Sequence, residues 1–334
     1  MQPLVSVIIP CRNEEKFISK CLDSIINNDY PKEKMEVLVV DGMSEDRTRE
    51  IIEKFKAKNE KLKIKVLDNP KKFTPFALNI GIKETKGDII MRMDAHATYD
   101  NKYISKGVKY LNEYDADNVG GIWKITPRET TLINKSICLA SSSVFGAGNA
   151  YYRMGYSKGL KWVDTVFGGC YRREVFDKIG LFNENLIRNQ DFEFNLRLRR
   201  AGGKILLVPN IVSYYYPKSN LRDFFMHNFK DGFSITHPLK LGVRAFSWRH
   251  LMPLIFVLGL TGTGILGIFF PIFVWFFLVI LGLYLLVNFY FSCEISIKEK
   301  NWKYFFVMPT VFAARHIGYG LGSIWGLILI IFKK

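Results

Sequence analysis

Two residues that can bind a metal ion, Asp94 and His96, follow a short apolar stretch at residues 89–93. The stretch predicts a strand. Residues two apart in an extended chain lie on one face, so a carboxylate and an imidazole there can meet one divalent cation. A turn with a solvated acid is the alternative for an isolated Asp-x-His. Because open α/β sheets bind ligands where strands end, the elements around this pair decide between the two interpretations.

Strands and helices alternate along the chain up to this pair. Apolar runs and helical spacing predict strands at 5–9, 36–40, 63–67 and 89–93, and helices at 13–26, from a cap at Ser44 or Asp46 to 57, and at 74–85. This alternation predicts a mostly parallel, doubly wound α/β sheet. The polar loops that follow three of the strands are expected to line one crevice. No Gly-x-Gly-x-x-Gly follows the first strand and no Walker loop occurs, which argues against a nicotinamide dinucleotide enzyme and an ATPase.

The segment after residue 165 supplies a second set of polar groups. Gly168 and Gly169 permit close approach of the backbone to a ligand. The apolar residues of 192–198 alternate, which is compatible with a strand. A helix is favoured, because Asp191 suits its first turn, Glu193 and Arg197 are four apart, and Gly202 suits a helix end. A last strand is expected at 204–209.

In order and spacing, four motifs resemble the inverting nucleotide-sugar glycosyltransferases with the GT-A fold. The motifs are Val-Ser-Val-Ile-Ile-Pro-Cys-Arg-Asn-Glu-Glu from residue 5, Val-Leu-Val-Val-Asp-Gly-Met-Ser-Glu-Asp from 37, Ala-Leu-Asn-Ile-Gly from 77 with Lys-Gly-Asp from 86, and Met-Asp-Ala-His from 93. The similarity extends over residues 4–215. The Met-Asp-Ala-His-Ala variant and the apolar tail resemble, more narrowly, membrane-bound exopolysaccharide glycosyltransferases of the succinoglycan-synthesis type.

The resemblance implies a donor site. The segment with Pro10, Arg12 and Glu14, together with Asp41, corresponds to residues that hold uracil and ribose. Asp94 and His96 stand where the family has Asp-x-Asp, which holds a divalent cation on the donor diphosphate. His96 departs from that motif, and an imidazole suits Mn²⁺ better than Mg²⁺. For Asp46 and Glu15 a helix cap or turn remains the favoured role.

The resemblance also implies a catalytic base. Gln190-Asp191 stands where the family has Glu-Asp, so Asp191 is the expected base, with a simple helix cap as the alternative. A cation is expected to help neutralise the leaving diphosphate. Three candidates, which the sequence does not rank, are Arg172, Arg199 and Lys230.

The apolar residues concentrate after residue 250 in a chain with a formal charge of +16. Residues 251–270 and 271–291 carry no charge and each is close to the ~20 residues that cross a bilayer. A third span is expected at 304–332. Because Arg315 and His316 lie near its middle, this segment crosses with them facing protein or water, is re-entrant, or lies partly in the interface. Basic residues at 218–250 predict a cytoplasmic catalytic domain, with the tip near Pro271 on the far side.

Residues 219–235 predict an amphipathic helix on the membrane surface, with core packing as the alternative. The expected divisions are a catalytic domain at 1–217, interfacial helices at 218–250 and an all-α transmembrane region at 251–334. The positive charge suits membrane lipids and phosphate ligands, and no nucleic-acid module is recognisable. The five cysteines show no paired spacing, so a reduced compartment is expected. The first residues predict a strand and no cleaved signal peptide.

Together these features predict a membrane-anchored inverting hexosyltransferase in cell-surface polysaccharide synthesis. It would move a sugar from a nucleotide diphosphate, expected to be UDP, to a hydroxyl of a polyprenyl-diphosphate-linked saccharide, one sugar per encounter. Its expected partners are the donor, the acceptor, membrane lipids and a second copy of itself. One alternative is a polyprenyl-phosphate monosaccharide synthase, whose acceptor is an ionised phosphate. A second is a non-catalytic membrane protein that senses nucleotide.

Overall fold

The structure is a computed structural model that describes residues 2–148, 150–155, 158–240 and 248–332. Its chain forms two compact units. Unit 1 contains Met1–Lys124 and Gly155–Tyr215, and unit 2 contains Ile125–Met154 and Tyr216–Lys334. The division at residue 217 expected from the sequence therefore misses residues 125–154, which belong with the C-terminal helices.

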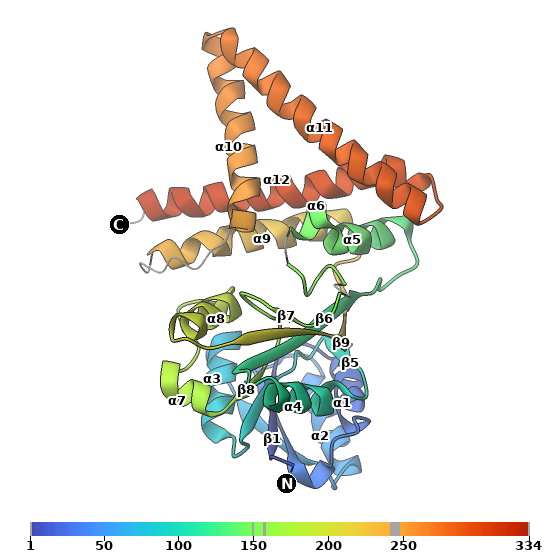
Figure 1. Cartoon of the computed structure of the whole chain (residues 1–334), viewed down its shortest axis with the longest axis vertical. Helices are drawn as coiled ribbons and strands as arrows, with labels where there is room; N and C mark the ends of the chain where they lie inside the picture. Colours follow the sequence, from blue (N-terminus) through green and yellow to red (C-terminus); the bar gives the residue numbers. More distant parts are fainter. Residues whose placement is uncertain (1, 149, 156–157, 241–247, 333–334) are drawn as a thin grey trace. The chain divides into compact units, whose positions relative to one another are not determined.

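A mixed sheet forms the centre of unit 1 (Figure 1). Its strands are β1 (Val5–Cys11), β2 (Met35–Asp41), β3 (Lys63–Asp68), β4 (Ile89–Arg92), β5 (Ala97–Tyr99), β6 (Asn118–Ile125), β7 (Lys161–Trp162), β8 (Cys170–Arg172) and β9 (Ile205–Tyr215). The order is β3-β2-β1-β4-β8-β6-β9-β5, and β7 pairs with β9. The pairs among β3, β2, β1 and β4 are parallel, whereas β4–β8, β6–β8, β5–β9 and β7–β9 are antiparallel. The expectation of a mostly parallel sheet thus applies to one half only, because β5, β7 and β8 are too short to give a periodic signal.

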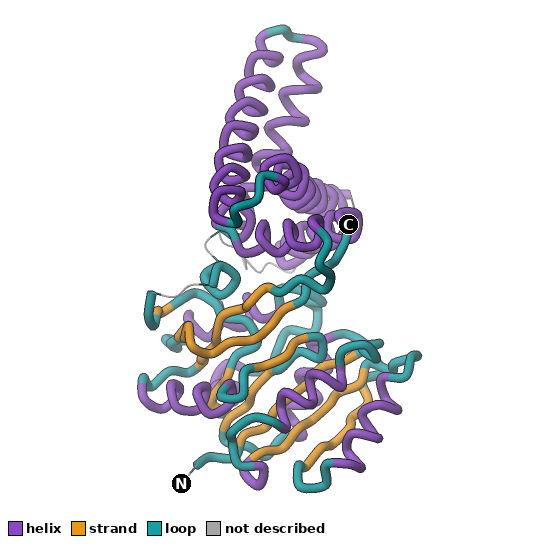
Figure 2. The backbone as a smooth tube through the Cα atoms, turned by 90° about the vertical axis from the view of Figure 1, so that its right-hand side faces the viewer, coloured by secondary structure: helices purple, strands orange, loops and turns teal. Residues whose placement is uncertain are grey.

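Helices lie on the sheet of unit 1 (Figure 2). They are α1 (Ile18–Ile26), α2 (Thr48–Lys58), α3 (Thr74–Glu84), α4 (Tyr103–Glu113), α7 (Glu174–Ile179) and α8 (Gln190–Arg200), with a short 3₁₀ turn at Lys32–Lys34. The inner strands β1 and β2 are buried along nearly their whole length, as expected for strands covered on both faces. They form the centre of the main core, so their carboxyl ends hold the loops that follow them in fixed positions.

Two helix boundaries in unit 1 bear on the site. The first helix starts at Ile18 and not near Asn13, because Asn13 has a φ of +54° and the amides of Phe17 and Ile18 close a turn on the Glu14 carbonyl. Residues around 192–198 form the helix α8, as expected, and Gly202 follows its end with a φ of +84°. The last strand, expected at 204–209, extends to Tyr215.

Unit 2 is helical within the described residues. Its helices are α5 (Leu132–Ser142), α6 (Val144–Ala147), α9 (Leu221–Lys240), α10 (Trp248–Phe269), α11 (Ile272–Lys298) and α12 (Lys303–Phe332). Ile137 and Ala140 of α5 pack in one apolar cluster with Phe224 of α9 and with Met308 and Phe312 of α12, among others. This burial explains why residues 125–154 belong to the C-terminal unit.

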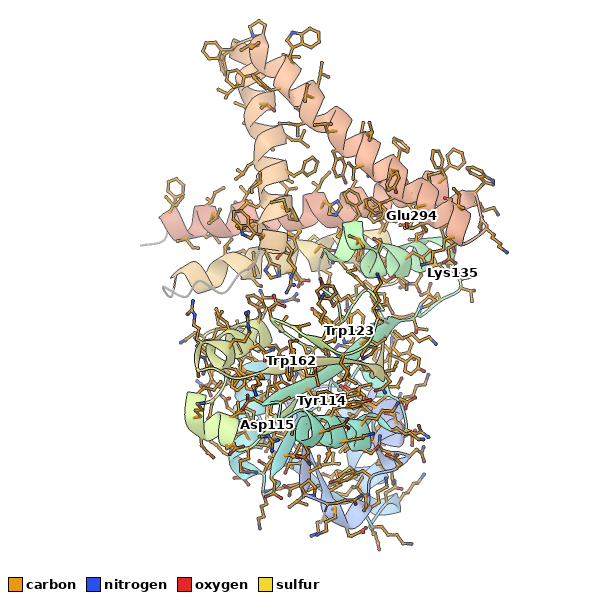
Figure 3. The ribbon with its side chains drawn as sticks, in the orientation of Figure 1. Tyr114, Asp115, Trp123, Lys135, Trp162 and Glu294 are labelled. Atoms are coloured by element: carbon orange, nitrogen blue, oxygen red, sulfur yellow. The ribbon has the colours of Figure 1, made fainter. Side chains whose placement is uncertain are left out.

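Three helices of unit 2, α10, α11 and α12, are long and apolar enough to cross a membrane. Figure 3 shows the side chains that project from α10 and α11, and many of the large apolar ones are exposed, including Ile268, Trp275 and Leu286 at 67–78%. Charged side chains such as Lys135 and Glu294 lie at the end of this unit where α5 meets α11 (Figure 3). An exposed apolar surface of this extent is typical of a membrane or partner contact.

The helices α9 and α12 run side by side in the same direction (Figure 1). A methyl group at Gly318 of α12 would lie 2.9 Å from the carbonyl oxygen of Phe225 on α9, and one at Gly322 would lie 2.0 Å from that of Phe229. The contacts recur every four residues on both helices. Glycine is required there because the two backbones approach so closely.

Candidate functional site

A pocket opens in unit 1 where β1 and β4 end. Its lining residues are Pro10, Cys11, Arg12, Glu14, Asn69, Lys72, Phe73, Thr74, Ala77, Arg92, Asp94 and His96. The cavity volume is about 160 Å³. Closed small-molecule sites typically have ~300–1,000 Å³, so this pocket encloses part of a nucleotide-sized ligand and leaves the rest in its open mouth.

Four of the five expected donor-site residues, Pro10, Arg12, Glu14 and Asp94, line this pocket. Asp41 is not part of the lining. Its carboxylate is buried, accepts hydrogen bonds from the amide and hydroxyl of Ser44, and lies 3.7 Å from the guanidinium of Arg49. Asp41 therefore holds the loop after β2 within the structure described.

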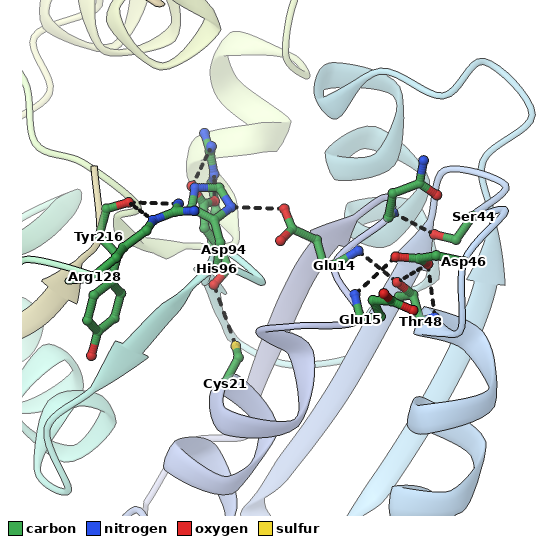
Figure 4. A network of polar contacts seen from close by, with 12 residues as sticks. Glu14, Glu15, Cys21, Ser44, Asp46, Thr48, Asp94, His96, Arg128 and Tyr216 are labelled. Carbon is green, nitrogen blue, oxygen red and sulfur yellow. Dashed lines mark hydrogen bonds and ion pairs between the residues drawn. The ribbon is translucent and has the colours of Figure 1, made fainter. Parts of the chain in front are cut away.

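The loop after β1 is joined to the loop after β4 through Glu14 and His96 (Figure 4). Nδ1 of His96 lies 3.2 Å from Oε1 of Glu14. The amide of Glu14 donates to the hydroxyl of Thr48, and the amide of Glu15 to the carboxylate of Asp46, at 2.7 and 3.2 Å. Asp46 also accepts from the Thr48 amide, so it has the turn role favoured from the sequence. These bonds fix Glu14 so that its carboxylate faces the imidazole.

Few side chains in this pocket could bind a divalent cation. Asp94 and His96 line the same pocket, and no group of three or more His, Cys, Asp or Glu side chains is placed to hold a metal within the described residues. A cation bound with a nucleotide diphosphate needs only one or two protein ligands, because phosphate oxygens and water complete its shell. Asp94 and His96 match that requirement.

Arg92, a residue that the sequence analysis treated as part of an apolar strand, connects the two halves of the site. It is 6% exposed, its Nε donates to Oδ1 of Asp94 at 3.0 Å, and its Nη1 donates to Oδ1 of Asp191. Its guanidinium carbon lies 5.4 Å from the ring centroid of Phe167. The signal was present in the sequence, because an arginine in a buried strand needs anionic partners.

Asp191 is held by this arginine and does not cap its helix. The helix α8 begins after Asn189, which has a φ of +60° and makes no side-chain cap. Burial raises the pKa of Asp191, the charge of Arg92 lowers it and that of Asp94 raises it, so that the pKa lies above its ordinary value. A carboxylate with a raised pKa accepts a proton more readily than a surface aspartate.

Asn79 of α3 holds the loop that precedes Asp191, through hydrogen bonds to Phe182 and Glu184. Its Nδ2 donates to the Phe182 carbonyl and to Oε1 of Glu184, both at 2.9 Å, and its Oδ1 accepts from the Phe182 amide at 3.0 Å. Asn79 is 3% exposed, and its two bonds to Phe182 are buried. The motif around Asn79 therefore positions the segment before α8.

Both expected glycines lie beside Arg92. Gly168 and Gly169 have φ values of +74° and +86°, and the Arg92 amide donates to the Gly169 carbonyl at 3.1 Å. A methyl group at Gly168 would lie 3.2 Å from the Arg92 carbonyl oxygen. The close approach that these glycines permit is thus to β4.

The two candidate cations of unit 1, Arg172 and Arg199, are not brought together with Asp191. Arg172 donates to the carbonyls of Ala116 and Leu111 at 3.1 and 3.0 Å. Arg199 is exposed in the last turn of α8, two turns from Asp191. Lys230 is exposed on α9 and belongs to unit 2.

Besides Arg92, the polar pocket residues Asn69 and Lys72 were missed in the sequence, because they lie in an irregular loop after β3. Lys72 has a φ of +67° and its amine lies 3.7 Å from Glu45, as Arg12 lies 3.6 Å from the same carboxylate. Asn69 is 1% exposed, and its Oδ1 has no hydrogen-bond partner among the described atoms. A buried acceptor without a partner at a pocket is a place for a ligand's N–H.

Comparisons with known proteins show what this chain is similar to. A family model described as Glycosyl transferase family 2 matches residues 6–180. A curated relative from Methanococcus voltae, a dolichyl N-acetyl-α-D-glucosaminyl phosphate 3-β-D-2,3-diacetamido-2,3-dideoxy-β-D-glucuronosyltransferase, is 33% identical over 76% of this chain and 79% of its own. The succinoglycan biosynthesis protein ExoA of Rhizobium meliloti (strain 1021) is 28% identical over 68% and 67%.

Among solved structures, the mannosyltransferase PcManGT from Pyrobaculum calidifontis, in complex with GDP-Man and Mn²⁺, is similar with a TM-score of 0.60. The similarity covers 97% of this chain and 88% of that one at 18% identity. It shows that the two chains share a fold, which is of the GT-A type followed by apolar helices.

Proposed function

Because the chain belongs to glycosyltransferase family 2, we propose that it is an inverting hexosyltransferase of cell-surface polysaccharide synthesis. Its donor is a nucleotide diphosphate sugar, and its acceptor is a hydroxyl of a polyprenyl-diphosphate-linked saccharide. The observation that carries this proposal is the bonded chain Asp94–Arg92–Asp191. It joins the pocket at the ends of β1 and β4 to a carboxylate with a raised pKa.

In the proposed reaction Asp191 removes the proton of the acceptor hydroxyl as its oxygen attacks the anomeric carbon. The bond from that carbon to the diphosphate breaks with inversion, and the nucleotide diphosphate leaves. Arg92 holds Asp191 in one orientation through the hydrogen bond from its Nη1. A positioned base of this kind typically contributes ~10²- to 10⁴-fold to the rate.

The pocket offers groups for the base and for the phosphates of a nucleotide. Oδ1 of Asn69 is a buried acceptor, while its Nδ2 already donates to the Phe73 carbonyl at 2.9 Å. Uracil N3 and guanine N1 each carry a hydrogen that this oxygen could accept, as do the exocyclic amines of cytosine and adenine, so this oxygen does not by itself select the base. Arg12 and Lys72 both pair with Glu45, which is 71% exposed on its side chain. Exposed pairs of this kind are worth little, so their cations are available to a phosphate.

Asp94 and His96 would hold a divalent cation, Mn²⁺ or Mg²⁺, which would neutralise charge on the leaving diphosphate. Glu14 supports His96 from the other side of the pocket by the contact at 3.2 Å. The chain's own contribution is therefore to fix the two side chains before the ligand arrives.

The acceptor and the membrane attachment follow from the relatives and from unit 2. The M. voltae relative carries a dolichyl phosphate sugar in its name, and ExoA takes part in succinoglycan synthesis. Exposed apolar side chains cover α10 and α11, so we propose that these two helices cross the membrane. Because α12 packs lengthwise on α9, which carries exposed Arg222 and Lys230, α12 is proposed to lie at the same membrane face. This packing supports the interfacial placement, one of the three that the sequence left open.

The close alternative is a polyprenyl-phosphate monosaccharide synthase. Its acceptor is already ionised and needs no base, so Asp191→Asn would leave its turnover nearly intact. The burial of Asp191 on Arg92 favours the hydroxyl acceptor. A non-catalytic nucleotide sensor would have no use for a base with a raised pKa beside its pocket.

The test is calorimetric titration of the detergent-solubilised full chain with UDP, with and without Mn²⁺, on wild type and Asp94→Ala. Binding that needs the cation and is lost in Asp94→Ala is expected. GDP is titrated in parallel as a second nucleotide. If neither nucleotide bound under any metal condition, the proposed donor site would be wrong.

A further inference from the structure

The backbone of Asp94 is held by the side chain of Tyr99, the last residue of β5. The amide of Asp94 donates to the hydroxyl of Tyr99 at 2.5 Å. That hydroxyl donates in turn to the carbonyl of Asp94, which lies 3.3 Å away. A single phenol oxygen therefore holds both polar backbone groups of a residue whose carboxylate lines the pocket.

The amide of Asp94 needs this partner because the ladder between β4 and β8 ends just before it. The Arg92 amide donates to the Gly169 carbonyl at 3.1 Å. In a continued antiparallel ladder, the next bond on this side would join the Asp94 amide to the Phe167 carbonyl. That carbonyl accepts from the Gly169 amide at 2.9 Å instead. Since Asp94 is 7% exposed, its amide would be buried without a partner if Tyr99 did not accept from it.

Tyr99 is itself fixed by the fold of unit 1. It pairs with Ser213 of β9 in the antiparallel ladder between β5 and β9. Its ring is buried, and the ring centroid lies 4.8 Å from that of Tyr103 on α4. Burial raises the pKa of Tyr99 well above its ordinary value, so the hydroxyl keeps its proton and can donate to Asp94.

The same carbonyl closes the turn that carries both proposed cation ligands. The carbonyl of Asp94 accepts from the amide of Ala97 at 3.1 Å, and His96 lies inside this turn. The thiol of Cys21 on α1 also donates to this carbonyl, at 3.5 Å (Figure 4). Tyr99 and Cys21 thus hold one end of the turn from two separate elements.

A buried tyrosine can be a core residue whose hydroxyl bonds to whatever group lies near. Here both bonds go to Asp94, and a shift of the backbone there would displace the carboxylate from the pocket. We propose that Tyr99, supported by the thiol of Cys21, positions Asp94 and His96 to bind the divalent cation. Tyr99 is a positioning residue, because it does not line the pocket itself. This inference rests on the proposed function, in which the two side chains hold the cation.

The test measures Mn²⁺ binding to the detergent-solubilised full chain with saturating UDP, by electron paramagnetic resonance of the free ion. Tyr99→Phe keeps the ring and removes only the hydroxyl. Its affinity for Mn²⁺ should fall roughly 10- to 100-fold, as is typical when a residue that orients a metal ligand is changed. Tyr110→Phe is the matched control and should bind Mn²⁺ like wild type, because its hydroxyl accepts from Nδ2 of Asn210 at an exposed place in the same unit.

A second measurement separates positioning from a general loss of stability. If Tyr99 acts through the cation site, excess Mn²⁺ should restore turnover of Tyr99→Phe, so that the half-maximal rate moves to a higher Mn²⁺ concentration. Cys21→Ala removes the weaker contact to the same carbonyl, and its Mn²⁺ affinity should fall about threefold. Should Tyr99→Phe not fold, a wild-type Mn²⁺ affinity in Cys21→Ala would overturn the proposal.

The outcomes distinguish this inference from the donor site on which it rests. Bound Mn²⁺ with equal affinity in wild type and Tyr99→Phe would overturn the role of Tyr99 alone. A wild type that binds no Mn²⁺ in the presence of UDP would overturn the proposed donor site, and this inference with it.

Discussion

The carboxylates of Asp94 and Asp191 are bonded to one guanidinium, that of Arg92, although they lie far apart in the sequence. Arg92 is buried on β4, so its orientation is set by the sheet and not by solvent. Any movement of one carboxylate is therefore transmitted to the other through a rigid planar group. The donor side and the base side of the proposed reaction share this one cation.

Arg92→Lys tests that role. Lysine keeps the charge but offers a single ammonium, which cannot hold two carboxylates in fixed directions. We expect turnover to fall roughly 10²-fold, since a small misplacement of a reacting group has an effect of that order. The measurement is the rate of UDP release from the UDP-sugar that the wild type uses.

Arg173→Lys is the matched control, because the guanidinium of Arg173 donates to the Gly87 carbonyl and to the Thr85 hydroxyl in unit 1 and to neither of the two carboxylates. Both variants should bind UDP. Turnover of Arg92→Lys equal to that of Arg173→Lys would contradict the bridging role.

The pH dependence of turnover should report Asp191. Burial raises its pKa, with Arg92 opposing and Asp94 adding to the effect, so the acidic limb of the profile should lie above the ordinary aspartate value of ~3.9. The base acts only when deprotonated, so the rate should fall about tenfold per pH unit below that pKa.

The raised pKa of Asp191 also makes the free energy of unfolding depend on pH, in a direction that follows from the sign of the shift. Because the folded state favours the protonated form, the stability contributed by Asp191 is present below its ordinary pKa and is lost as the pH rises through the raised value. Asp191→Asn should remove this dependence in thermal unfolding measured from pH 4 to 8. A wild-type acidic limb at or below pH 3.9 would argue against Asp191 as the base.

Much of the pocket lining could be predicted from the sequence, because loops that follow the strands of a parallel α/β sheet line a crevice. Pro10, Arg12, Glu14, Asp94 and His96 all line one pocket as expected. The parts that were missed depend on tertiary contacts with no local pattern. Arg92 looked like an interruption of an apolar strand.

The division of the chain was missed for a similar reason. The helix α5 carries an ordinary apolar face, and only its packing with Phe224 and Phe312 assigns it to unit 2. The extent of α9 and α12 was close to that expected, but their parallel contact depends on glycines that a hydropathy profile treats as neutral. The local sequence pattern thus predicted where these helices lie in the chain, but not which helices pack against one another.

Asn79→Ala should destabilise unit 1 and reduce turnover together. The change leaves the amide and carbonyl of Phe182 without their buried partner, at a cost of roughly 1–3 kcal/mol. The loop before α8 would then hold Asp191 less firmly. Thermal unfolding and the rate of UDP release measure the two effects, and Asn185→Ala, an exposed asparagine of the same loop, is the control. A stable variant with full turnover would show that the loop is positioned by other contacts.

Gly322→Ala should loosen the pairing of α9 and α12. The added methyl group would lie 2.0 Å from the Phe229 carbonyl oxygen, which is backbone and cannot turn aside. Overpacking of ~2 kcal/mol corresponds to a melting temperature lower by roughly 4–8 °C. Gly282→Ala in α11, where a methyl group meets nothing within 4 Å, is the matched control and should unfold like wild type. Equal melting temperatures for the two variants would mean that α9 and α12 accommodate the methyl group with no loss of stability.

The position of the C-terminus tests whether α12 crosses the membrane. If α10 and α11 are the two crossings, a chain that enters at Trp248 returns to the same side by Lys303, and α12 then remains there beside α9. A cysteine introduced after Phe332 should therefore react with an impermeant maleimide from the side of the catalytic unit. A cysteine at Pro271, between α10 and α11, should react from the opposite side only. Labelling of both positions from the same side would require α12 to cross, and the parallel contact of Gly318 and Gly322 with α9 would then have to be absent in the membrane.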